Sequence, residues 1–369
     1  MLKLSNPERM LMTLLESSLN GKAPEVSSFR EASNQDWKEC AQLAKSQGVL
    51  ALAWEGLCRL PEELQPYKGL KISWALAAEV CEENCRRYCH TVGELSSFYR
   101  DHGISLVQMK GVGLSTYYKV PLHREGGDID IYTFSADCSR MTDRQAHDLA
   151  DALMAEQGVE VELDHPKHSH FVFKGIPVEN HKSFLDLDRC PLSEKAESIL
   201  HDSLEPQEVE LPTGDRIMIP SDRFNTLFVG FHALAHYGSG LALHHLYDWA
   251  CMIKKCGLDL PEEIRADRHF MKGINAMTVI CNRYLGTDIP VKASRRIVSD
   301  MLEDILHPID YTKITVKGTW NVLRFKFRRF RHDIRSKHRF LHTPILKNEK
   351  LWTKVIRSIQ WHLTHSMTE

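Results

Sequence analysis

The N-terminal part of the chain places apolar residues three or four positions apart, which is the period of a helix that buries one face. Segments that start at Pro7 and Trp37 show this spacing, and the longest repeat predicts one helix from about Lys71 to Asp101. His102-Gly103 follows as a helix stop. We therefore expect the first part of the chain to be helical.

The pattern changes at Ile104–Met109, which is apolar and partly β-branched and predicts a strand. Gly111 and Gly113 follow as turn residues, and the next residues are compatible with the start of a helix. A loop then leads to a second predicted strand that contains Asp128 and Asp130. The expected order is strand, glycine turn, helix start, loop and strand.

A helix and a hairpin are predicted after these strands. Alanine and leucine recur at helical spacing from Asp143 to Gly158, where the glycine favours a helix end. Residues His170–His181 indicate a hairpin that turns at Lys174-Gly175. Strand, helix, strand and strand is the order that a small mixed sheet with a crossover requires, so the expected fold class is α+β.

The rest of the chain is predicted to be loop-rich and then helical. Residues 182–219 contain turn signals at 187–191 and 211–215, which favour loops. Ser221 or Asp222 is then placed to cap a helix. The apolar face of this helix consists of Phe224, Leu227, Phe228, Phe231 and Leu234.

These patterns predict four regions: N-terminal helices over 1–102, a core with the small mixed sheet over 103–219, a helical domain over 220–309 and a basic tail over 310–369. The tail has 14 Lys and Arg against 4 Asp and Glu, a net charge of +10, and the first 309 residues carry −12. An amphipathic helix at 312–340 can contact an anionic membrane surface or another polyanion, or it can fold onto the body. Its apolar stripe consists of Trp320, Leu323, Phe327, Phe330 and Ile334.

Composition is typical of a globular protein, because 43% of the 369 residues are hydrophobic. The sequence shows neither an apolar run of about 18 residues nor a signal-type N-terminus, which predicts a cytoplasmic protein without a transmembrane segment. The ten cysteines form no Cys-x-x-Cys pair and fit reduced thiols. Cys81, Cys85 and Cys89 share one face of the long helix, where a buried stripe explains them better than a metal does.

Candidate chemistry begins with the alternation of side chains along the predicted strands. Residues two apart share a face, so Asp128 and Asp130 project together while Ile129 points into the core. Two close carboxylates repel each other unless a cation lies between them. Carboxylate oxygens suit Mg²⁺, which is usually held by one or two carboxylates and substrate phosphates. By the same alternation Glu179 and His181 share a face, which adds a third carboxylate.

The glycine turn, the Asp-x-Asp strand and the later acidic strand residue resemble the DNA-polymerase-β-like nucleotidyltransferase superfamily. Over about residues 75–250 the chain more closely resembles a bacterial family of uncharacterised nucleotidyltransferases that is often associated with polysaccharide gene clusters. The superfamily usually shows Gly-Ser or Gly-Gly where this chain has Lys110-Gly111, and more often Asp where Glu179 stands. The closer resemblance rests on Met109-Lys110-Gly111, Tyr117 and Tyr118, Pro121, Arg124, Asp128-Ile-Asp130-Ile131 and Val178-Glu179-x-His181.

The resemblance implies that three acids, Asp128, Asp130 and Glu179, hold Mg²⁺ or Mn²⁺. The metals in turn bind the triphosphate of an NTP and activate the hydroxyl of an acceptor. On the same hypothesis His181 orients Glu179 or contacts the acceptor.

Three further residues are candidates for contact with the triphosphate. Gly111 lets the turn approach the phosphates closely, and Lys110 or Arg124 neutralises their charge. Each cation has a simpler interpretation. Lys110 can be a solvated strand end, and Arg124 can pair with Glu125 or Asp128.

Histidines form the last candidate group. His232 and His236 are one helical turn apart, and His245 and Asp248 are three residues apart. In the resembling family such residues lie behind the acidic strands, which implies that they close the base or acceptor side. The favoured alternative is a set of core histidines that bond to the backbone or to Asp248. A zincin-type helix would need Glu where Ala233 stands.

The leading hypothesis is therefore metal-dependent transfer of a nucleoside monophosphate from an NTP to a hydroxyl acceptor, with sugar or polysaccharide chemistry implied by the family context. One alternative is a toxin- or antitoxin-type enzyme that modifies protein or RNA. The other is a non-catalytic module that binds a nucleotide or a partner. DNA polymerisation is disfavoured, because the acidic body shows no interleaved aromatic and basic residues.

Overall fold

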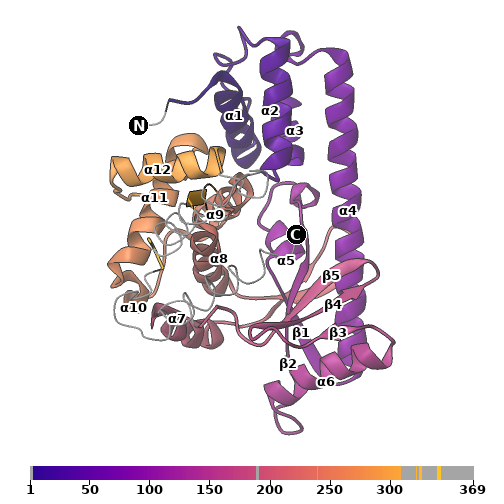
Figure 1. The fold of residues 1–369 in the computed structure, drawn as a ribbon. Helices are drawn as coiled ribbons and strands as arrows, with labels where there is room; N and C mark the ends of the chain where they lie inside the picture. The colour runs from indigo at the N-terminus through magenta and orange to yellow at the C-terminus, as the bar shows by residue number, and fades with distance from the viewer. Residues whose placement is uncertain are drawn as a thin grey trace.

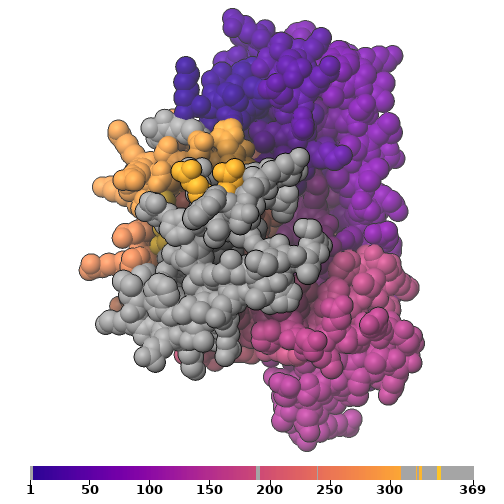
Figure 2. Space-filling model, viewed as in Figure 1, coloured from indigo at the N-terminus to yellow at the C-terminus, as the bar shows by residue number. Residues whose placement is uncertain are grey.

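The structure, a computed structural model, describes residues 3–187, 191–238, 240–308, 321, 324–325 and 339–341. N-terminal helices lead into a mixed sheet, and a second set of helices follows it (Figure 1). The space-filling view shows the N-terminal helices at one end of the molecule, and the sheet with its covering helix at the other (Figure 2). The apolar stripe predicted in the tail, from Trp320 to Ile334, lies outside the described residues.

The N-terminal region is helical, as predicted. It comprises α1 Asn6–Asn20, α2 Asn34–Ser46, α3 Leu50–Leu57, a short 3₁₀ turn at Glu62–Leu64, and α4 Lys68–Asp101. The Ser33 side chain caps α2 by accepting a hydrogen bond from the backbone N–H of Asp36, whose carboxylate accepts one in return from the N–H of Ser33. Gly103, with φ of 76°, ends α4 in the left-handed conformation that favours glycine.

A seven-stranded mixed sheet forms the centre of the fold, in the order β3-β4-β5-β2-β1-β7-β6. β1 and β2 are antiparallel, and β2 runs parallel to β5 after a crossover through α6. This arrangement confirms the expected α+β class and the predicted hairpin at Lys174-Gly175, which joins β4 to β5. The bounds are β1 Ile104–Met109, β2 Ile129–Ser135, α6 Asp143–Glu156, β3 Val161–Glu162, β4 His168–Phe173 and β5 Ile176–His181.

The expectation that 182–219 is loop-rich was wrong. This segment contains α7 Pro191–Asp202 and a second hairpin, β6 Gln207–Glu210 with β7 Arg216–Ile219. Each strand has only four residues, too few for a clear alternation, and β6 is an edge strand with little burial. The turn predicted at 211–215 is present, and β7 extends the sheet by pairing with β1.

The C-terminal helices are α8 Asp222–His236, α9 Leu243–Cys256, α10 Glu262–Arg265, α11 Arg268–Tyr284 and α12 Arg295–Leu306. Ser221 caps α8, as predicted, by accepting a hydrogen bond from the backbone N–H of Phe224. The predicted apolar face of α8 is buried. Among the described helices, none combines the length and the apolar character that crossing a membrane requires.

Two apolar cores hold the molecule together. The larger core joins the N-terminal helices to α8, α9, α11 and α12, and it includes Trp74 near the start of α4. The smaller core lies between the sheet, α6 and the second half of α4, where it includes Cys85, Cys89 and Ile131. The long helix α4 therefore contributes to both cores, and Figure 1 shows it running from α2 and α3 down to the strands. All the cysteines in the described part of the chain are free.

Candidate active site

The turn after β1 carries a lysine in an unusual backbone conformation. Lys110 has φ of 48° and ψ of −145° and precedes the short helix α5 Gly111–Ser115. Gly111 also has a positive φ, 43°, which confirms the tight turn predicted there. The Lys110 side chain is largely buried, and its Nζ lies 2.7 Å from Oδ1 of Asp130. Lys110 is therefore an ion-pair partner inside the site and not a solvated strand end.

Asp130 and Glu179 meet on neighbouring strands because β2 and β5 are parallel and these two residues are register partners. Ile129 and Ile131 point into the smaller core, so Asp130 projects from the opposite face, as the alternation predicts. His181 lies between the acids, with its Nε2 3.0 Å from Oδ1 of Asp130 and 3.4 Å from Oε2 of Glu179.

Asp128 lies directly before β2 and not inside it, which differs from the sequence-based prediction by one residue. Burial, and then the neighbouring Asp130, raise the pKa of Asp128. Burial also acts to raise the pKa of Asp130, but Lys110 and His181 outweigh it and hold that pKa well below its ordinary value. For Glu179, the hydrogen bond from His181 lowers the pKa. Asp128 thus resists ionisation, and a nearby cation would favour its ionised form.

One atom of the acidic cluster has no partner among the residues that the structure describes. Oδ2 of Asp130 is fully buried and accepts no hydrogen bond from any of them. Asp130, Glu179 and His181 each offer one ligand atom, and these atoms lie within 4.8 Å of one another. A buried carboxylate oxygen without a donor is costly, and the carboxylates of Asp130 and Glu179 offer the oxygen ligands that suit Mg²⁺ or Mn²⁺.

Two residues near the acids were not predicted from the sequence. The ring of His168 on β4 lies 3.6 Å from Oε2 of Glu179, because His168 is the register partner of His181 in the hairpin. Lys167 is close enough for its charge to interact with Asp130 and Glu179, and burial together with Lys110 lowers its pKa. The register around the predicted turn was the signal that could have found His168.

Arg124 has a partner that the sequence did not suggest. Its Nε and Nη2 donate to Oδ1 and Oδ2 of Asp248 on α9, each at 2.9 Å, and the Tyr118 hydroxyl donates to the same carboxylate at 2.6 Å. Glu125 instead accepts a hydrogen bond from the backbone N–H of Leu50. The suggested pairing of Arg124 with Glu125 or Asp128 was therefore wrong, and a buried ion pair ties the loop before Asp128 to α9.

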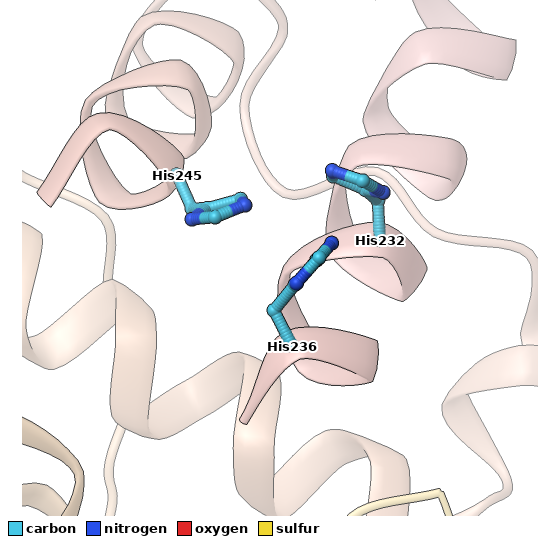
Figure 3. A group of neighbouring side chains, drawn as sticks. All are labelled: His232, His236 and His245. Atoms are coloured by element: carbon cyan, nitrogen blue, oxygen red, sulfur yellow. The ribbon is translucent and has the colours of Figure 1, made fainter. Parts of the chain in front are cut away.

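The histidines converge, but not on Asp248. His232 and His236 on α8 meet His245 from the first turn of α9 (Figure 3). Asp248 binds Arg124 and Tyr118, and Nδ1 of His245 accepts a hydrogen bond from the backbone N–H of Ala242. The expectation of a backbone partner is thus confirmed for His245, whereas the Asp248 carboxylate pairs with Arg124 and Tyr118.

The site consists of a glycine turn after one strand, followed by acids at two neighbouring strands of a mixed sheet, and the family model assigns the chain to the nucleotidyltransferase class. The chain belongs to the family described as uncharacterised nucleotidyltransferases, which it matches over residues 33–269. No curated protein matches the sequence. Among solved structures, the chain is similar to an antigenic nucleotidyltransferase-like protein from Paracoccidioides brasiliensis, with 12% identity and a TM-score of 0.36 over 57% of this chain and 95% of that one. A likeness of that size adds no weight to the family assignment.

Proposed function

We propose that this protein is a metal-dependent nucleotidyltransferase that moves a nucleoside monophosphate from an NTP to a hydroxyl acceptor. Family membership supports the reaction class. The observation that carries the metal requirement is the buried Oδ2 of Asp130, which has no donor in the described part of the chain and belongs to a carboxylate that faces Glu179. Asp128, Asp130 and Glu179 are the residues that would hold Mg²⁺ or Mn²⁺.

In the proposed reaction an acceptor oxygen bonds to the α-phosphorus of the NTP. The bond between that phosphorus and the oxygen that bridges to the β-phosphate breaks, and pyrophosphate leaves. A bound divalent metal supplies charge neutralisation on the phosphate oxygens and lowers the pKa of the acceptor hydroxyl. Glu179 is ionised at neutral pH, because the hydrogen bond from His181 lowers its pKa, and it takes the hydroxyl proton.

The cations of the site have separate proposed roles. Lys110 lies among the acids and is placed to neutralise charge on the triphosphate, while Gly111 lets the backbone of the turn come close to it. Two nitrogens of Arg124 donate hydrogen bonds to Asp248, so we propose that Arg124 acts mainly by fixing the loop that presents Asp128. His181 contacts both Glu179 and Asp130, and we propose that it fixes the position of one carboxylate relative to the other.

For the acceptor we propose a sugar or polysaccharide hydroxyl, as the family resemblance implies. Protein and RNA acceptors are the second class to test, because the fold alone does not select among hydroxyls. A panel of radiolabelled NTPs against these three acceptor classes would identify the transferred group. A nucleotide that binds with Mg²⁺ but is transferred to no acceptor would instead indicate a non-catalytic binding module.

The first test is nucleotide binding by calorimetry, with ATP, CTP, GTP and UTP, with and without Mg²⁺. We expect the wild-type chain to bind one nucleotide only with the metal, and Asp128→Asn or Asp130→Asn to weaken binding at least about 10-fold, because each removes a metal ligand. The matched control is Asp148→Asn, which changes an exposed aspartate on α6.

Two results would contradict the assignment. Metal-dependent binding that survives both aspartate variants would place the metal elsewhere. If correctly folded wild-type protein binds no nucleotide under any condition, the NTP must be removed from the proposal. Loss of binding in Asp148→Asn as well would mean that the effect is not specific to the acidic cluster.

A further inference from the structure

The histidine cluster brings together three imidazoles from two helices. His232 and His236 are one turn apart on α8 and project from the same face, and His245 reaches them from the first turn of α9. The ring centroids are separated by 4.6 Å for His232 and His236, 4.7 Å for His236 and His245, and 5.4 Å for His232 and His245. Figure 3 shows the three rings facing one common space between the helices.

The backbone under this cluster is closely packed. A Cβ on Gly230 of α8 would lie 3.3 Å from the Trp249 ring of α9 and 3.0 Å from Ile274 of α11, so the absence of a side chain lets these helices approach. Trp249 is fully buried, and its indole N–H donates to the Thr278 hydroxyl. The histidines therefore project from helices whose relative position is fixed by the core.

The donor set selects a class of metal. One nitrogen from each ring lies within 4.8 Å of the other two, and among the described residues no carboxylate belongs to this group. Imidazole nitrogens suit zinc and other late first-row transition metals, whereas Mg²⁺ prefers oxygen ligands. We propose that His232, His236 and His245 form a second metal site that takes Zn²⁺ or a similar transition metal, with water as the fourth ligand.

Zinc holds histidine nitrogens at about 2.0–2.1 Å, so small ring rotations would bring the three nitrogens around one ion. His245 is buried, while His232 and His236 are partly exposed, which leaves a path for the ion and its water. Burial, and then Lys110, lower the pKa of His232, and burial with His244 lowers that of His245. Neutral rings are the form that binds a metal.

Metal binding has a structural cost at His245. Its Nδ1 accepts a hydrogen bond from the N–H of Ala242 at 3.1 Å, so Nε2 is the atom left for the ion. In the neutral ring the proton is then on Nε2, and it moves to Nδ1 when a metal takes Nε2. The contact with Ala242 is lost in the same step, so we expect the first turn of α9 to loosen on metal binding.

The second site does not depend on the proposed transfer reaction. Its ligands come from α8 and α9, whereas the acidic cluster comes from β2, β5 and the residue before β2. The two clusters are nevertheless neighbours, because the charges of Lys110 and Lys167 act on His232 and also on Asp130. Even so, their ligands are different residues, so a variant that removes a ligand of one cluster leaves every ligand of the other in place.

The experiment uses the full chain, stripped with a chelator and titrated with Co²⁺ as a visible probe and with Zn²⁺ as a competitor. With excess Mg²⁺ present to occupy the acidic cluster, we expect one equivalent of Co²⁺ to give the d–d absorption of a four-coordinate site with three nitrogens and a water, and one equivalent of Zn²⁺ to displace it. His232→Asn and His245→Asn each remove one ligand and are expected to weaken binding at least about 100-fold. The control is His244→Asn, since Nδ1 of His244 faces the Gln47 carbonyl oxygen, and the His244 ring contacts that of His245 at a centroid distance of 3.9 Å without being one of the three grouped ligands.

Each outcome decides the proposal. Binding retained by His244→Asn and Asp130→Asn but lost in the two cluster variants supports it, provided that the metal-free variants unfold at the wild-type midpoint. If a cluster variant fails to fold, His236→Gln replaces it. No Co²⁺ absorption, or absorption lost in Asp130→Asn and kept in His232→Asn, overturns the proposal. Intact Co²⁺ binding without any nucleotide binding would reject the transferase function and leave the second site standing.

Discussion

Lys110 is a single residue in which backbone conformation and charge are linked. A positive φ costs a residue with a side chain about 1–3 kcal/mol, and at Lys110 it accompanies an ion pair with Asp130. The ammonium group of Lys110 occupies the position beside the acids. When a metal or a substrate phosphate is bound, the ammonium group would have to share that position. Lys110 thus stabilises Asp130 as an anion in the protein without substrate.

Replacing Lys110 with Met tests this link. Removal of one partner from a buried ion pair is expected to destabilise the fold by about 3–5 kcal/mol at neutral pH. In the wild type the lowered pKa of Asp130 contributes stability above its ordinary pKa of 3.8, and that stability is lost as the pH falls toward the folded-state pKa. Without Lys110, His181 alone opposes the effect of burial, so the pKa of Asp130 is lowered less and the stability lost between pH 3.8 and the folded-state pKa should be smaller than in the wild type. Urea unfolding from neutral to acid pH measures both effects.

Lys174 provides the control for this variant. It also has a positive φ, 52°, and an ion-pair partner, Glu94, but both side chains are exposed. Lys174→Met should therefore leave stability and its pH dependence nearly unchanged. Both substitutions keep a side chain at a positive φ and remove only the charge, so equal effects would show that the burial of the Lys110–Asp130 pair does not matter.

At the scale of elements, the position of α5 depends on a close approach to β1. A Cβ on Gly113 would lie 2.8 Å from the carbonyl oxygen of Gln108 and 3.2 Å from Ile219 on β7. The start of α5 can therefore lie against the sheet only while residue 113 has no side chain. This contact sets where the turn at Lys110-Gly111 points.

Gly113→Ala should move α5 away from β1. We expect a loss of about 1–3 kcal/mol in the free energy of unfolding, as in other overpacked sites, together with weaker binding of Mg²⁺-NTP. Gly127→Ala is the matched control, because a Cβ there meets nothing within 4 Å and Gly127 also adjoins the acids. Chemical denaturation measures the loss of stability, and calorimetry measures nucleotide binding. If Gly113→Ala is destabilised but binds nucleotide as the wild type does, the position of the turn does not affect the site.

Elements with strong local signals were predictable, and their register was only partly so. The strand at Ile104–Met109, the stop at Gly103 and the Lys174-Gly175 turn follow from residue preferences within a few positions. The hairpin of β6 and β7 was missed, since its strands are short and are stabilised by pairing with β1, which lies about a hundred residues earlier.

At the scale of the whole molecule, α4 joins the two cores. It has 34 residues, and is thus about 51 Å long at 1.5 Å per residue. Trp74 and Ala78 belong to the larger core, whereas Cys89, Val92 and Leu95 belong to the smaller one. A disturbance of either core therefore acts on the same helix.

Leu95→Ala should lower the stability of the whole chain by about 2–5 kcal/mol, because Leu95 is fully buried in the smaller core. We expect one cooperative transition in which tryptophan fluorescence and far-ultraviolet circular dichroism coincide. Leu76→Ala on the exposed face of the same helix should change stability by less than about 0.5 kcal/mol. Two separate transitions, with only one shifted by Leu95→Ala, would show that α4 does not couple the cores.

The parts of the candidate site that sequence could not supply come from contacts between distant segments. Alternation along strands grouped Asp128 with Asp130 and Glu179 with His181, and the parallel pairing of β2 with β5 brings Asp130, Glu179 and His181 together. No local pattern brings His245 to the two histidines of α8, because the packing at Gly230 decides that contact. The partner of Arg124 was missed for the same reason, since Asp248 lies 124 positions away.

The buried pair of Arg124 and Asp248 also constrains how such a sequence can change over generations. Loss of either partner leaves an uncompensated charge in the interior, whereas joint replacement by apolar residues of similar size is often nearly neutral. Descendants of this chain that keep the fold should therefore inherit the arginine and the aspartate together or lose them together. In an alignment of relatives the two positions should therefore covary, even though one lies in a loop and the other in a helix.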